Sequence, residues 1–394
     1  MTLIAAIGQA QVTDAREAGM QAAYQALNGV GTVSPAFGLL IVPHRYDPQQ
    51  VINGAASILT NTPLIGFSVS TGISNASAHS HAVVIALLAG DSLQAETHWL
   101  PSFSQSSAEA ALRIAQLIGY EQRPAEYVLA FAEGFRPGSN TDEFCANLPA
   151  GLQVFGGLAS GDMLSDNSFQ IAGMQSGTGS LAAAFLRGNI KVGIGYGHGW
   201  HAVGSHVRIT RSDGFWLRGL DGKPASEIYS QLFGQTSHNW TMQPLNTISR
   251  IYPLGFEQAA TDELLIRAPI RMDADGSLRM NSTIPEGSEA RLMVASPTDC
   301  VQAAHLAAKQ ALSNLGDAKP VFALVLVDPA WQTILQAWPG KEIQIIQSVL
   351  GSSVPIAGGY THGQIVPPSE NNGRARLLNQ HILVAIFGEK ETQK

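Results

Sequence analysis

In the stretch Val154-Phe155-Gly156-Gly157-Leu158-Ala159-Ser160-Gly161, a short apolar strand runs directly into a glycine turn. Two further segments have the same form, residues 63–73 and 354–365. The second and third copies align without a gap across the turn, and the first copy carries one extra residue. Self-similarity of this kind indicates a chain assembled from structural repeats.

The same order of elements surrounds each copy of this turn. A helix comes first, and a hydroxyl or carboxylate side chain at its start can accept the unpaired N–H groups of the first turn. A near-continuous apolar strand follows, and then a proline (Pro48, Pro137 or Pro329) that suits the first turn of a second helix. The sequence therefore predicts three β-α-β-α-β-β units, with first helices at 13–27, 106–118 and 297–315, buried strands at 37–42, 127–131 and 321–327, and closing strands at 81–88, 180–186 and 380–387.

These units place the chain in the α/β (α+β) class. Strands that are apolar on both faces need cover on both sides, so we expect stacked sheets flanked by helices. A strand-rich insertion is predicted at about 188–287, with a helix after Asp221-Gly222-Lys223-Pro224-Ala225 and a hairpin around residues 273–276. We expect two closely packed domains: residues 1–212 hold two units, and residues 213–394 hold the strand-rich segment and the third unit.

The composition argues against several classes of function. The 394 residues carry 23 Lys plus Arg against 30 Asp plus Glu, a net charge of −7, and the first lysine is Lys191. Nucleic-acid binding needs a dense basic face to replace phosphate counterions, so we expect no nucleic-acid partner. The apolar runs are far shorter than the ~20 residues of a membrane-spanning helix, so we expect no membrane insertion. Only two cysteines, and no basic segment at the N-terminus, favour a cytoplasmic protein.

One segment is unusually rich in glycine: Lys191-Val192-Gly193-Ile194-Gly195-Tyr196-Gly197-His198-Gly199-Trp200-His201. As a strand it would present four glycines on one face, with Tyr196, His198 and Trp200 on the other. A row of glycine marks close approach by a ligand or by another backbone. The segment is therefore one of two things. It is a pocket wall with an aromatic and imidazole rim, or it is a place where sheets pack tightly and the His198 ring is hydrogen-bonded inside the protein.

Catalytic and metal motifs are incomplete in this chain. Residues 66–70 lack the last glycine of the hydrolase nucleophile elbow. His198 and His201 have a plausible ligand spacing, but a closed zinc site needs four ligands. A single histidine in an apolar pocket is enough for haem, because the porphyrin supplies the other nitrogens. We expect a protein that is not an enzyme; the alternative is an enzyme whose nucleophile is Ser68, Ser70, Cys145 or Cys300.

An ordered set of motifs carries a family resemblance. The most specific are Gly197-His198-Gly199-Trp200-His201-Ala202-Val203-Gly204, Leu220-Asp221-Gly222-Lys223-Pro224-Ala225 and Gly359-Tyr360-Thr361-His362-Gly363-Gln364-Ile365. With residues 152–161 they resemble the FIST family of sensory proteins, which has FIST-N and FIST-C halves, over nearly the whole chain. Two positions depart from the family pattern: Gln364 stands where Glu is common, and Asp328-Pro329-Ala330-Trp331 replaces a Cys-x-Gly-Arg turn.

The resemblance implies a sensory role. Such domains bind small ligands, with amino acids proposed, and act on signalling modules. A stand-alone chain of this length resembles the nitric-oxide sensing haemoproteins of bacteria, which modulate a partner histidine kinase. This implies haem b and nitric oxide, and His198 is our first choice for the iron ligand because it shares a face with Tyr196 and Trp200. His201 and His362 are the alternatives.

The patterns leave more than one function open. The first is a cytoplasmic haem-binding sensor of nitric oxide that acts on a signalling protein such as a histidine kinase. The second is a non-haem sensor of a small metabolite such as an amino acid, whose carboxylate would meet the N–H groups of the glycine turns. An enzyme with a Ser or Cys nucleophile and a plain interaction scaffold complete the set. The predicted ligand-binding residues are Gly157, Tyr196, His198, Trp200, His201, Arg211, Gly359, Tyr360 and His362.

Overall fold

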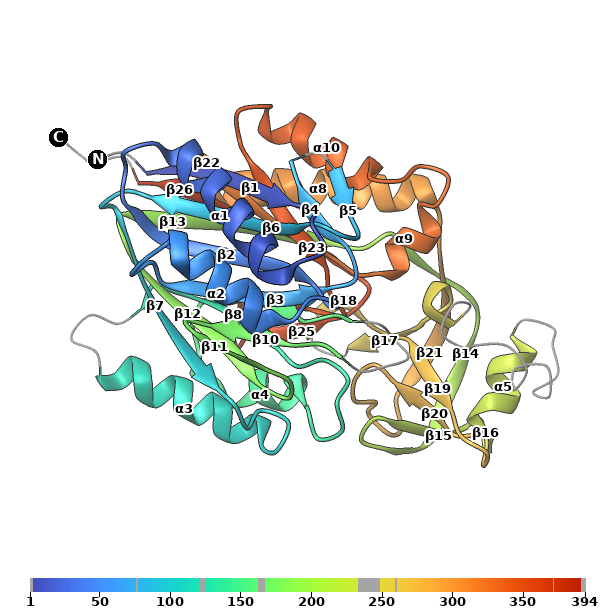
Figure 1. The fold of residues 1–394 in the computed structure, drawn as a ribbon. Helices are drawn as coiled ribbons and strands as arrows, with labels where there is room; N and C mark the ends of the chain where they lie inside the picture. Colours follow the sequence, from blue (N-terminus) through green and yellow to red (C-terminus); the bar gives the residue numbers. More distant parts are fainter. Residues whose placement is uncertain are drawn as a thin grey trace.

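The computed structural model describes residues 3–75, 77–120, 125–161, 167–232, 249–258, 261–370 and 372–390. Within these ranges the strands form three six-stranded sheets and one eight-stranded sheet. The six-stranded sheets mix parallel and antiparallel pairs, and helices cover their outer faces (Figure 1). The predicted mixed α/β class is confirmed.

Three units with one order of elements supply the six-stranded sheets. The first consists of β1 (Ile4–Ala10), α1 (Ala15–Val30), β2 (Pro35–Pro43), α2 (Pro48–Ile58), β3 (Leu64–Val69), β4 (Gly72–Ser74), β5 (Ser77–His79) and β6 (Val83–Ala89). The second consists of β7 (Leu93–Leu100), α3 (Ser107–Tyr120), β8 (Tyr127–Ala132), α4 (Thr141–Asn147), β9 (Val154–Leu158), β10 (Gln170–Ala172), β11 (Gln175–Gly177) and β12 (Leu181–Gly188). The third consists of β13 (Ile190–Gly197), α8 (Pro297–Leu315), β22 (Lys319–Val327), α9 (Ala330–Ile334), α10 (Lys341–Leu350), β23 (Ile356–Tyr360), β24 (Gln364–Val366), β25 (Arg376–Leu378) and β26 (Ile382–Glu389).

The units exchange hairpins in a closed ring. The first sheet, β1-β6-β2-β3, is extended by β10 and β11 of the second unit. The second sheet, β7-β12-β8-β9, is extended by β24 and β25 of the third unit, and the third sheet, β13-β26-β22-β23, by β4 and β5 of the first. The predicted six-element unit lacks this hairpin, because strands of three residues are too short to show a period of two.

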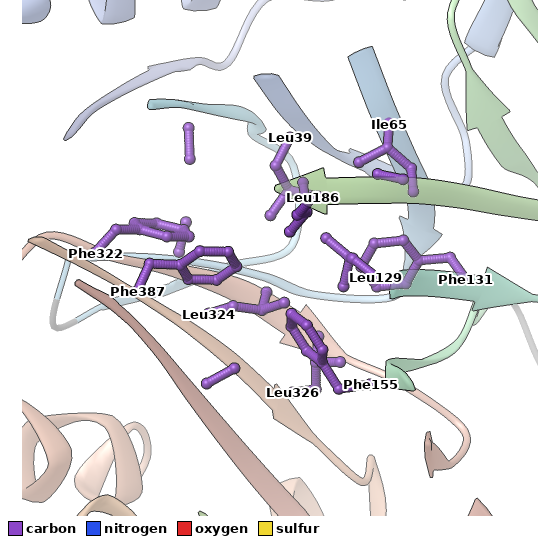
Figure 2. Close-up of a cluster of buried hydrophobic side chains, with 14 of the residues drawn as sticks. Leu39, Ile65, Leu129, Phe131, Phe155, Leu186, Phe322, Leu324, Leu326 and Phe387 are labelled. Carbon is purple, nitrogen blue, oxygen red and sulfur yellow. The ribbon is translucent and has the colours of Figure 1, made fainter. Parts of the chain in front are cut away.

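The central core lies where one face of each six-stranded sheet meets the other two. The opposite face of each sheet packs on its own helices: α1 and α2, α3 and α4, or α8 and α10. Burial on both faces explains the near-continuous apolar strands, and the expected stacking takes the form of three sheets around one core. Figure 2 shows the central side chains from all three units: Leu39, Ile65, Leu129, Phe131, Phe155, Leu186, Phe322, Leu324, Leu326 and Phe387.

Capping side chains mark where α8 and α4 begin. Ser296 Oγ accepts the N–H of Asp299 at 3.2 Å, and α8 spans the predicted 297–315. The predicted helix start at Pro137 is wrong, because α4 begins at Thr141, where Asn140 Oδ1 accepts the N–H of Glu143 at 3.1 Å. No helix in the described ranges is long and apolar enough to span a bilayer.

The eight-stranded sheet, called here the inserted sheet, lies between β13 and α8 in the chain. Figure 1 shows it at one end of the molecule, away from the two termini. It starts at residue 200 rather than 188, because residues 190–197 pair with β26 and complete the third sheet. The predicted hairpin is β19–β20, the predicted helix is α5, and the expected domain boundary at 212/213 falls at the end of β14. Its elements are β14 (Trp200–Asp213), β15 (Trp216–Leu220), β16 (Lys223–Pro224), α5 (Ala225–Gln231), η1 (Ser249–Ile251), β17 (Leu254–Gln258), β18 (Thr261–Arg267), β19 (Pro269–Met272), β20 (Leu278–Met280) and β21 (Glu289–Ala295).

Candidate functional site

The glycine face of β13 packs on the backbone of α8. A Cβ built at Gly193 would lie 2.2 Å from Ala311 O, and one at Gly195 would lie 2.1 Å from Ala307 O. Real side chains cannot approach a carbonyl so closely, so glycine is required here. The pocket-floor interpretation of this face is therefore wrong. The glycines provide close packing, as in the alternative interpretation, but against a helix rather than a second sheet.

A different region brings polar groups together. In the second and third sheets, the parallel pairs β8–β9 and β22–β23 end beside the inserted sheet. Arg279 of β20 donates to the carbonyl of Phe135 after β8, and Trp200 of β14 donates to the carbonyl of Gln380, whose N–H binds Asp328 after β22. The carboxyl ends of parallel strands are the usual place for ligands in α/β proteins. Strand β18 contacts α4 and the segment between β25 and β26 through Arg267. We call this contact between β18 and the strand-end loops of units two and three the seam.

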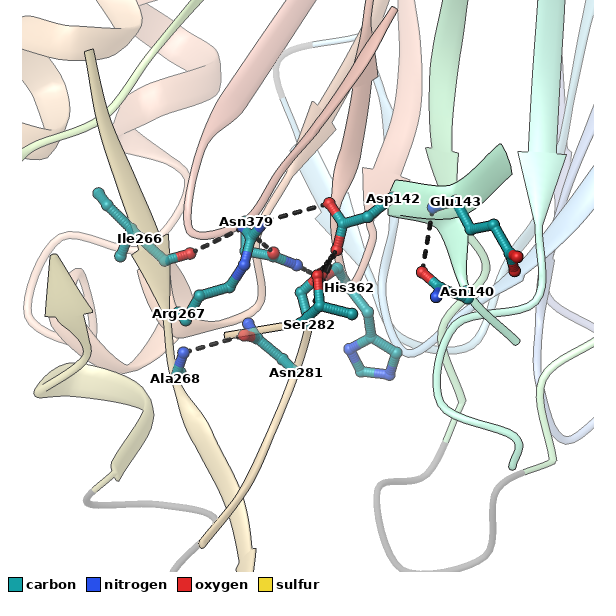
Figure 3. A network of polar contacts seen from close by, with 11 residues as sticks. Asn140, Asp142, Glu143, Ile266, Arg267, Ala268, Asn281, Ser282, His362 and Asn379 are labelled. Carbon is teal, nitrogen blue, oxygen red and sulfur yellow. Dashed lines mark hydrogen bonds and ion pairs between the residues drawn. The ribbon is translucent and has the colours of Figure 1, made fainter. Parts of the chain in front are cut away.

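Arg267 is a buried cation at the seam, with 1% of its surface exposed. Its Nη1 donates to Asn379 Oδ1 at 2.7 Å, and its Nη2 lies 3.1 Å from Asp142 Oδ1 (Figure 3). Burial lowers the pKa of Arg267, and the nearby Asp142 acts in the opposite direction. A buried guanidinium needs such partners to offset its lost hydration, so Asp142 and Asn379 fix the position of β18.

Asp142 lies in the first turn of α4 and is surrounded by donors. Its Oδ1 faces Arg267. Its Oδ2 accepts from Ser282 Oγ and from Thr283 Oγ1, the latter at 2.9 Å. Ser282 and Thr283 follow β20, so a second segment of the inserted sheet reaches the same carboxylate. Both oxygens of Asp142 are engaged by the inserted sheet.

Two buried carboxylates hold equivalent turns in different units. Asp328, after β22, accepts the N–H of Gln380 at 3.0 Å. Glu133, after β8, accepts the N–H of Gly179 at 2.9 Å. Each contact fixes the turn that leads into the last strand of its unit. The two acids are unrelated in sequence spacing, and the repeat relates them in space.

Burial raises the pKa of Asp328 to about 6. The N–H of Ala330, which donates to Asp328 Oδ1 at 2.9 Å, and the Arg250 guanidinium lower that pKa and only partly offset burial. Asp328 is thus a carboxyl group that changes charge near neutral pH.

The imidazoles of His381 and His362 lie near Asn379. His381 Nδ1 is 2.6 Å from Asn379 O, and burial, with a smaller effect from His198, lowers the pKa of His381 to about 3. The His362 ring stacks on Phe135 with centroids 4.3 Å apart. Burial holds the pKa of His362 well below its usual value. Both rings are therefore neutral at pH 7.

A cavity of about 430 Å³ opens at the seam beside these groups. Its charged lining residues are Asp142, Arg267 and Arg376, and most of the others are apolar. Arg376 Nη2 donates to Tyr196 OH at 3.0 Å, which connects the cavity to the end of β13. An apolar cavity with a few convergent polar groups is typical of small-molecule sites.

Four of the predicted residues border the seam. Tyr196 contacts Arg376, and the Asn379 amide donates to the backbone carbonyl of His362 at 3.1 Å. Trp200 Nε1 donates to the carbonyl of Gln380 at 3.1 Å. His198 Nδ1 accepts the N–H of Trp200 at 3.1 Å, and its ring meets that of His381 edge-on at 4.8 Å.

The other five predicted residues lie elsewhere. His201 is exposed, and its Nε2 lies 3.4 Å from Asp299 Oδ1. Arg211 is also exposed, where β14 pairs with β15. Gly157 and Gly359 are buried where the exchanged hairpins pair, opposite Gln364 and Gly72. Tyr360 is also buried, and its hydroxyl donates to Glu342. The glycine turns of the repeat are thus hairpin junctions.

The residues predicted from the sequence do not include Arg267, Asn379, Arg376 and His381. The polar triplet Asn379-Gln380-His381 directly before an apolar strand was the one signal in the sequence. Polar residues at this place are commonly exposed turn residues, so the triplet alone did not indicate a buried site. Arg267 gave no such signal. It shares its segment with Arg271, which is exposed, and sequence alone does not say which arginine is buried.

The three histidines considered for haem have separate surroundings. His198 faces His381, His201 is exposed beside Asp299, and His362 lies against Phe135. None of them lines any of four cavities, of about 430 to 800 Å³, that lie at the seam and on units one and two. In the same ranges, no group of three or more His, Cys, Asp or Glu side chains is placed to hold a metal ion.

Comparisons with known proteins identify the chain. The FIST N domain matches residues 36–223, and the FIST C domain matches residues 225–367. An uncharacterized protein of Methanocaldococcus jannaschii is 26% identical over 118 residues, which is 27% of this chain and 22% of that protein. A cyanuric acid hydrolase structure from A. caulinodans is 13% identical over 47% of this chain and 71% of its own, with a TM-score of 0.24.

FIST domains are small-ligand sensory domains of signalling proteins. The two family matches follow one another in the order N then C and cover most of the chain, so this protein belongs to the FIST family.

Proposed function

We propose that this protein is a sensor that binds a small metabolite at the seam and reports its presence to a partner signalling protein. The observation that carries the proposal is Arg267, which is buried at a cavity and tied to unit two through Asp142 and to unit three through Asn379. A ligand in that cavity touches the inserted sheet and the three-unit core together.

Such a site can convert binding into a conformational signal. A ligand shifts a protein between two arrangements only if it binds one of them better. Groups from β18, α4 and β25 line one cavity, so a ligand there binds best when the inserted sheet is held firmly against the core. The free energy of binding then stabilises that arrangement, which a partner protein can recognise.

A thermal-stability screen of the full chain against a metabolite collection tests the sensor function. A true ligand at 100 times its Kd adds about 2.7 kcal/mol of stability. Hydrogen exchange with the ligand bound should slow in residues 264–267 and 282–285. No stabilising compound, or protection confined to the exposed end of β14 around Arg211, would contradict the proposal.

Haem b, nitric oxide and a histidine-kinase partner stay predictions from the sequence. None of the three histidines lines any of the four cavities described above, so we derive no step through haem. Titration with hemin checks the prediction. A Soret band that shifts with nitric oxide and is lost on replacing one of the three histidines would establish it, and a flat spectrum would remove it.

We also propose that the protein binds its ligand without catalysing a reaction on it, and that it acts in the cytoplasm. Burial raises the pKa of Cys300 to about 12 and also raises that of Cys145, and buried thiols of this kind are poor nucleophiles. The Ser68 hydroxyl accepts the N–H of Phe169 at 2.9 Å and is fully buried. Stoichiometric labelling of Ser68, Ser70, Cys145 or Cys300 by an activity-based probe would favour the enzyme alternative instead.

A further inference from the structure

The Nε of Arg267 has no hydrogen-bond partner in the part of the chain that the structure describes. The rest of the guanidinium is engaged by Asn379, Asp142 and the carbonyl of Ile266. A buried N–H group without an acceptor is uncommon, because the group has lost its hydration and gained nothing. Arg267 lines the cavity at the seam, but its Nε is itself buried, so an acceptor in the cavity reaches this N–H only when the guanidinium turns toward the cavity.

The charges of the cavity favour an anion. Two guanidiniums, those of Arg267 and Arg376, line it together with a single carboxylate, that of Asp142. The oxygens of Asp142 already accept from Arg267, Ser282 and Thr283. The lining therefore carries a net positive charge and offers no uncommitted carboxylate to a cation.

The remaining walls favour an aliphatic body. Leu265, Ile284, Pro285, Leu377 and Leu378 line the same cavity. Its volume of about 430 Å³ lies within the range of small-molecule sites. Apolar side chains of this kind gain free energy by removing a hydrocarbon chain from water, and they have no donor or acceptor for a polar one.

We propose that the cavity at the seam binds a branched aliphatic carboxylate that carries no ammonium group, such as a branched α-keto acid. This rests on the sensor function proposed above and narrows its ligand. The carboxylate pairs with Arg376, which keeps its contacts to Tyr196 OH and Ser369 Oγ, and with Arg267 Nε once that guanidinium turns toward the cavity. The branched chain lies against the leucines. An amino acid of the same shape places an ammonium group beside two guanidiniums with no free carboxylate to receive it, which disfavours it.

Calorimetric titration of the full chain with α-ketoisocaproate tests the ligand class. Leucine is the compound with the same carbon skeleton and an ammonium group in place of the keto oxygen, and 4-methyl-2-oxopentanamide is the matched compound without charge. The keto acid should bind at least about tenfold more tightly than either, which corresponds to one charge-assisted hydrogen bond gained or one unpaired charge avoided.

Two variants test the site without removing the buried Arg267. Arg376→Gln should weaken binding of the keto acid by about tenfold or more. Arg374→Gln makes the same change of charge at an exposed residue that does not line the cavity, and it should leave binding unchanged. Ala146→Phe adds a ring at an exposed position of the cavity rim and should block binding. Unfolding midpoints of all three variants show whether each is folded.

The outcomes separate this inference from the proposed function. Equal binding of leucine, or stabilisation by some other metabolite but not by the keto acid, overturns the ligand class and leaves the sensor function standing. Binding of the keto acid that is insensitive to both Arg376→Gln and Ala146→Phe overturns the site. If no compound of the collection binds, the sensor function and the inference both fail.

Discussion

Burial acts in opposite directions on the two kinds of titratable side chain at the seam. It raises the pKa of Asp328 to about 6 and lowers the pKa of His381 to about 3. Both shifts favour the neutral form, because a charged group loses its hydration when it leaves water. The stability of this region therefore depends on pH in two opposite ways, which single substitutions separate.

For Asp328, the folded-state pKa of about 6 lies above the unfolded value of 3.8. The contribution of the protonated Asp328 carboxyl to the free energy of unfolding is then fully present below about pH 4 and is lost as pH rises through 6. Relative to Asp328→Asn, the wild-type protein should lose about 2–3 kcal/mol of unfolding free energy between pH 4 and pH 7. Urea unfolding across this range measures it, with the exposed Asp317→Asn as control. A difference that stays flat or grows with pH would contradict the burial argument.

For His381, the folded-state pKa of about 3 lies below the unfolded value of 6.5. The contribution of the neutral His381 imidazole to the free energy of unfolding is fully present above pH 6.5 and is lost as pH falls toward 3. Relative to His381→Gln, the wild-type protein should lose about 2 kcal/mol between pH 7 and pH 5. Calorimetric melting at several pH values checks this, and the exposed His206→Gln provides the baseline. The opposite slope would mean that the imidazole is charged in the folded protein.

At the scale of elements, the contact between β13 and α8 depends on glycine. A Cβ at Gly195 would meet Ala307 O at 2.1 Å, whereas one at Gly197 would lie 3.5 Å from Ala303 O, an ordinary contact. Gly195→Ala should therefore destabilise the protein by about 1–3 kcal/mol or more, because helix and strand must separate. Gly197→Ala, on the same face of the same strand, should change stability by less than about 0.5 kcal/mol. The urea unfolding midpoints of the two variants measure this difference. Equal midpoints would contradict the prediction and show that the structure accommodates the Cβ at Gly195 without separating β13 from α8.

Elements could be predicted from the sequence where a local signal fixes them. Helix α8 has a capping serine and a long apolar period, and its predicted bounds agree with the structure. Helix α4 shows the limit of such signals: Pro137 suggested a helix start, but the chain turns first and Asn140 provides the cap. The hairpin β24–β25 has strands of three residues, and its partner β9 lies about two hundred residues earlier in the chain. No local pattern encodes such a pairing.

At the scale of the whole molecule, the candidate site arises from contacts between distant segments. Arg267, Asp142 and Asn379 come from the inserted sheet, the second unit and the third unit. The residues predicted from the sequence lie on the glycine segment, on the repeat turns and, for Arg211, on β14. Of these only Tyr196, His198, Trp200 and His362 border the seam. Chemistry that is assembled across units could not be read from motifs within one unit.

The ring of exchanged hairpins predicts that the three units fold only together. A fragment of residues 1–189 lacks β24 and β25 from the second sheet and leaves β4 without its partner β23. It also lacks the third face of the central core, including Leu324 and Phe387. We expect this fragment to bind a hydrophobic dye and to unfold without a cooperative transition, because its exposed apolar faces have no cover.

The matched comparison removes the inserted sheet instead. Deleting residues 200–295 and joining the ends with a short Gly/Ser linker keeps all three six-stranded sheets and the core between them. This protein should keep a single cooperative thermal transition. Its Tm should be lower because the Arg267–Asp142 contact is lost. It should still fold because Asp142 is then open to water and is not left as a buried unpaired charge. Circular dichroism melting of the two proteins side by side is the measurement. Cooperative unfolding of the 1–189 fragment as a monomer would show that the hairpin exchange is dispensable, and the units would then be independent domains.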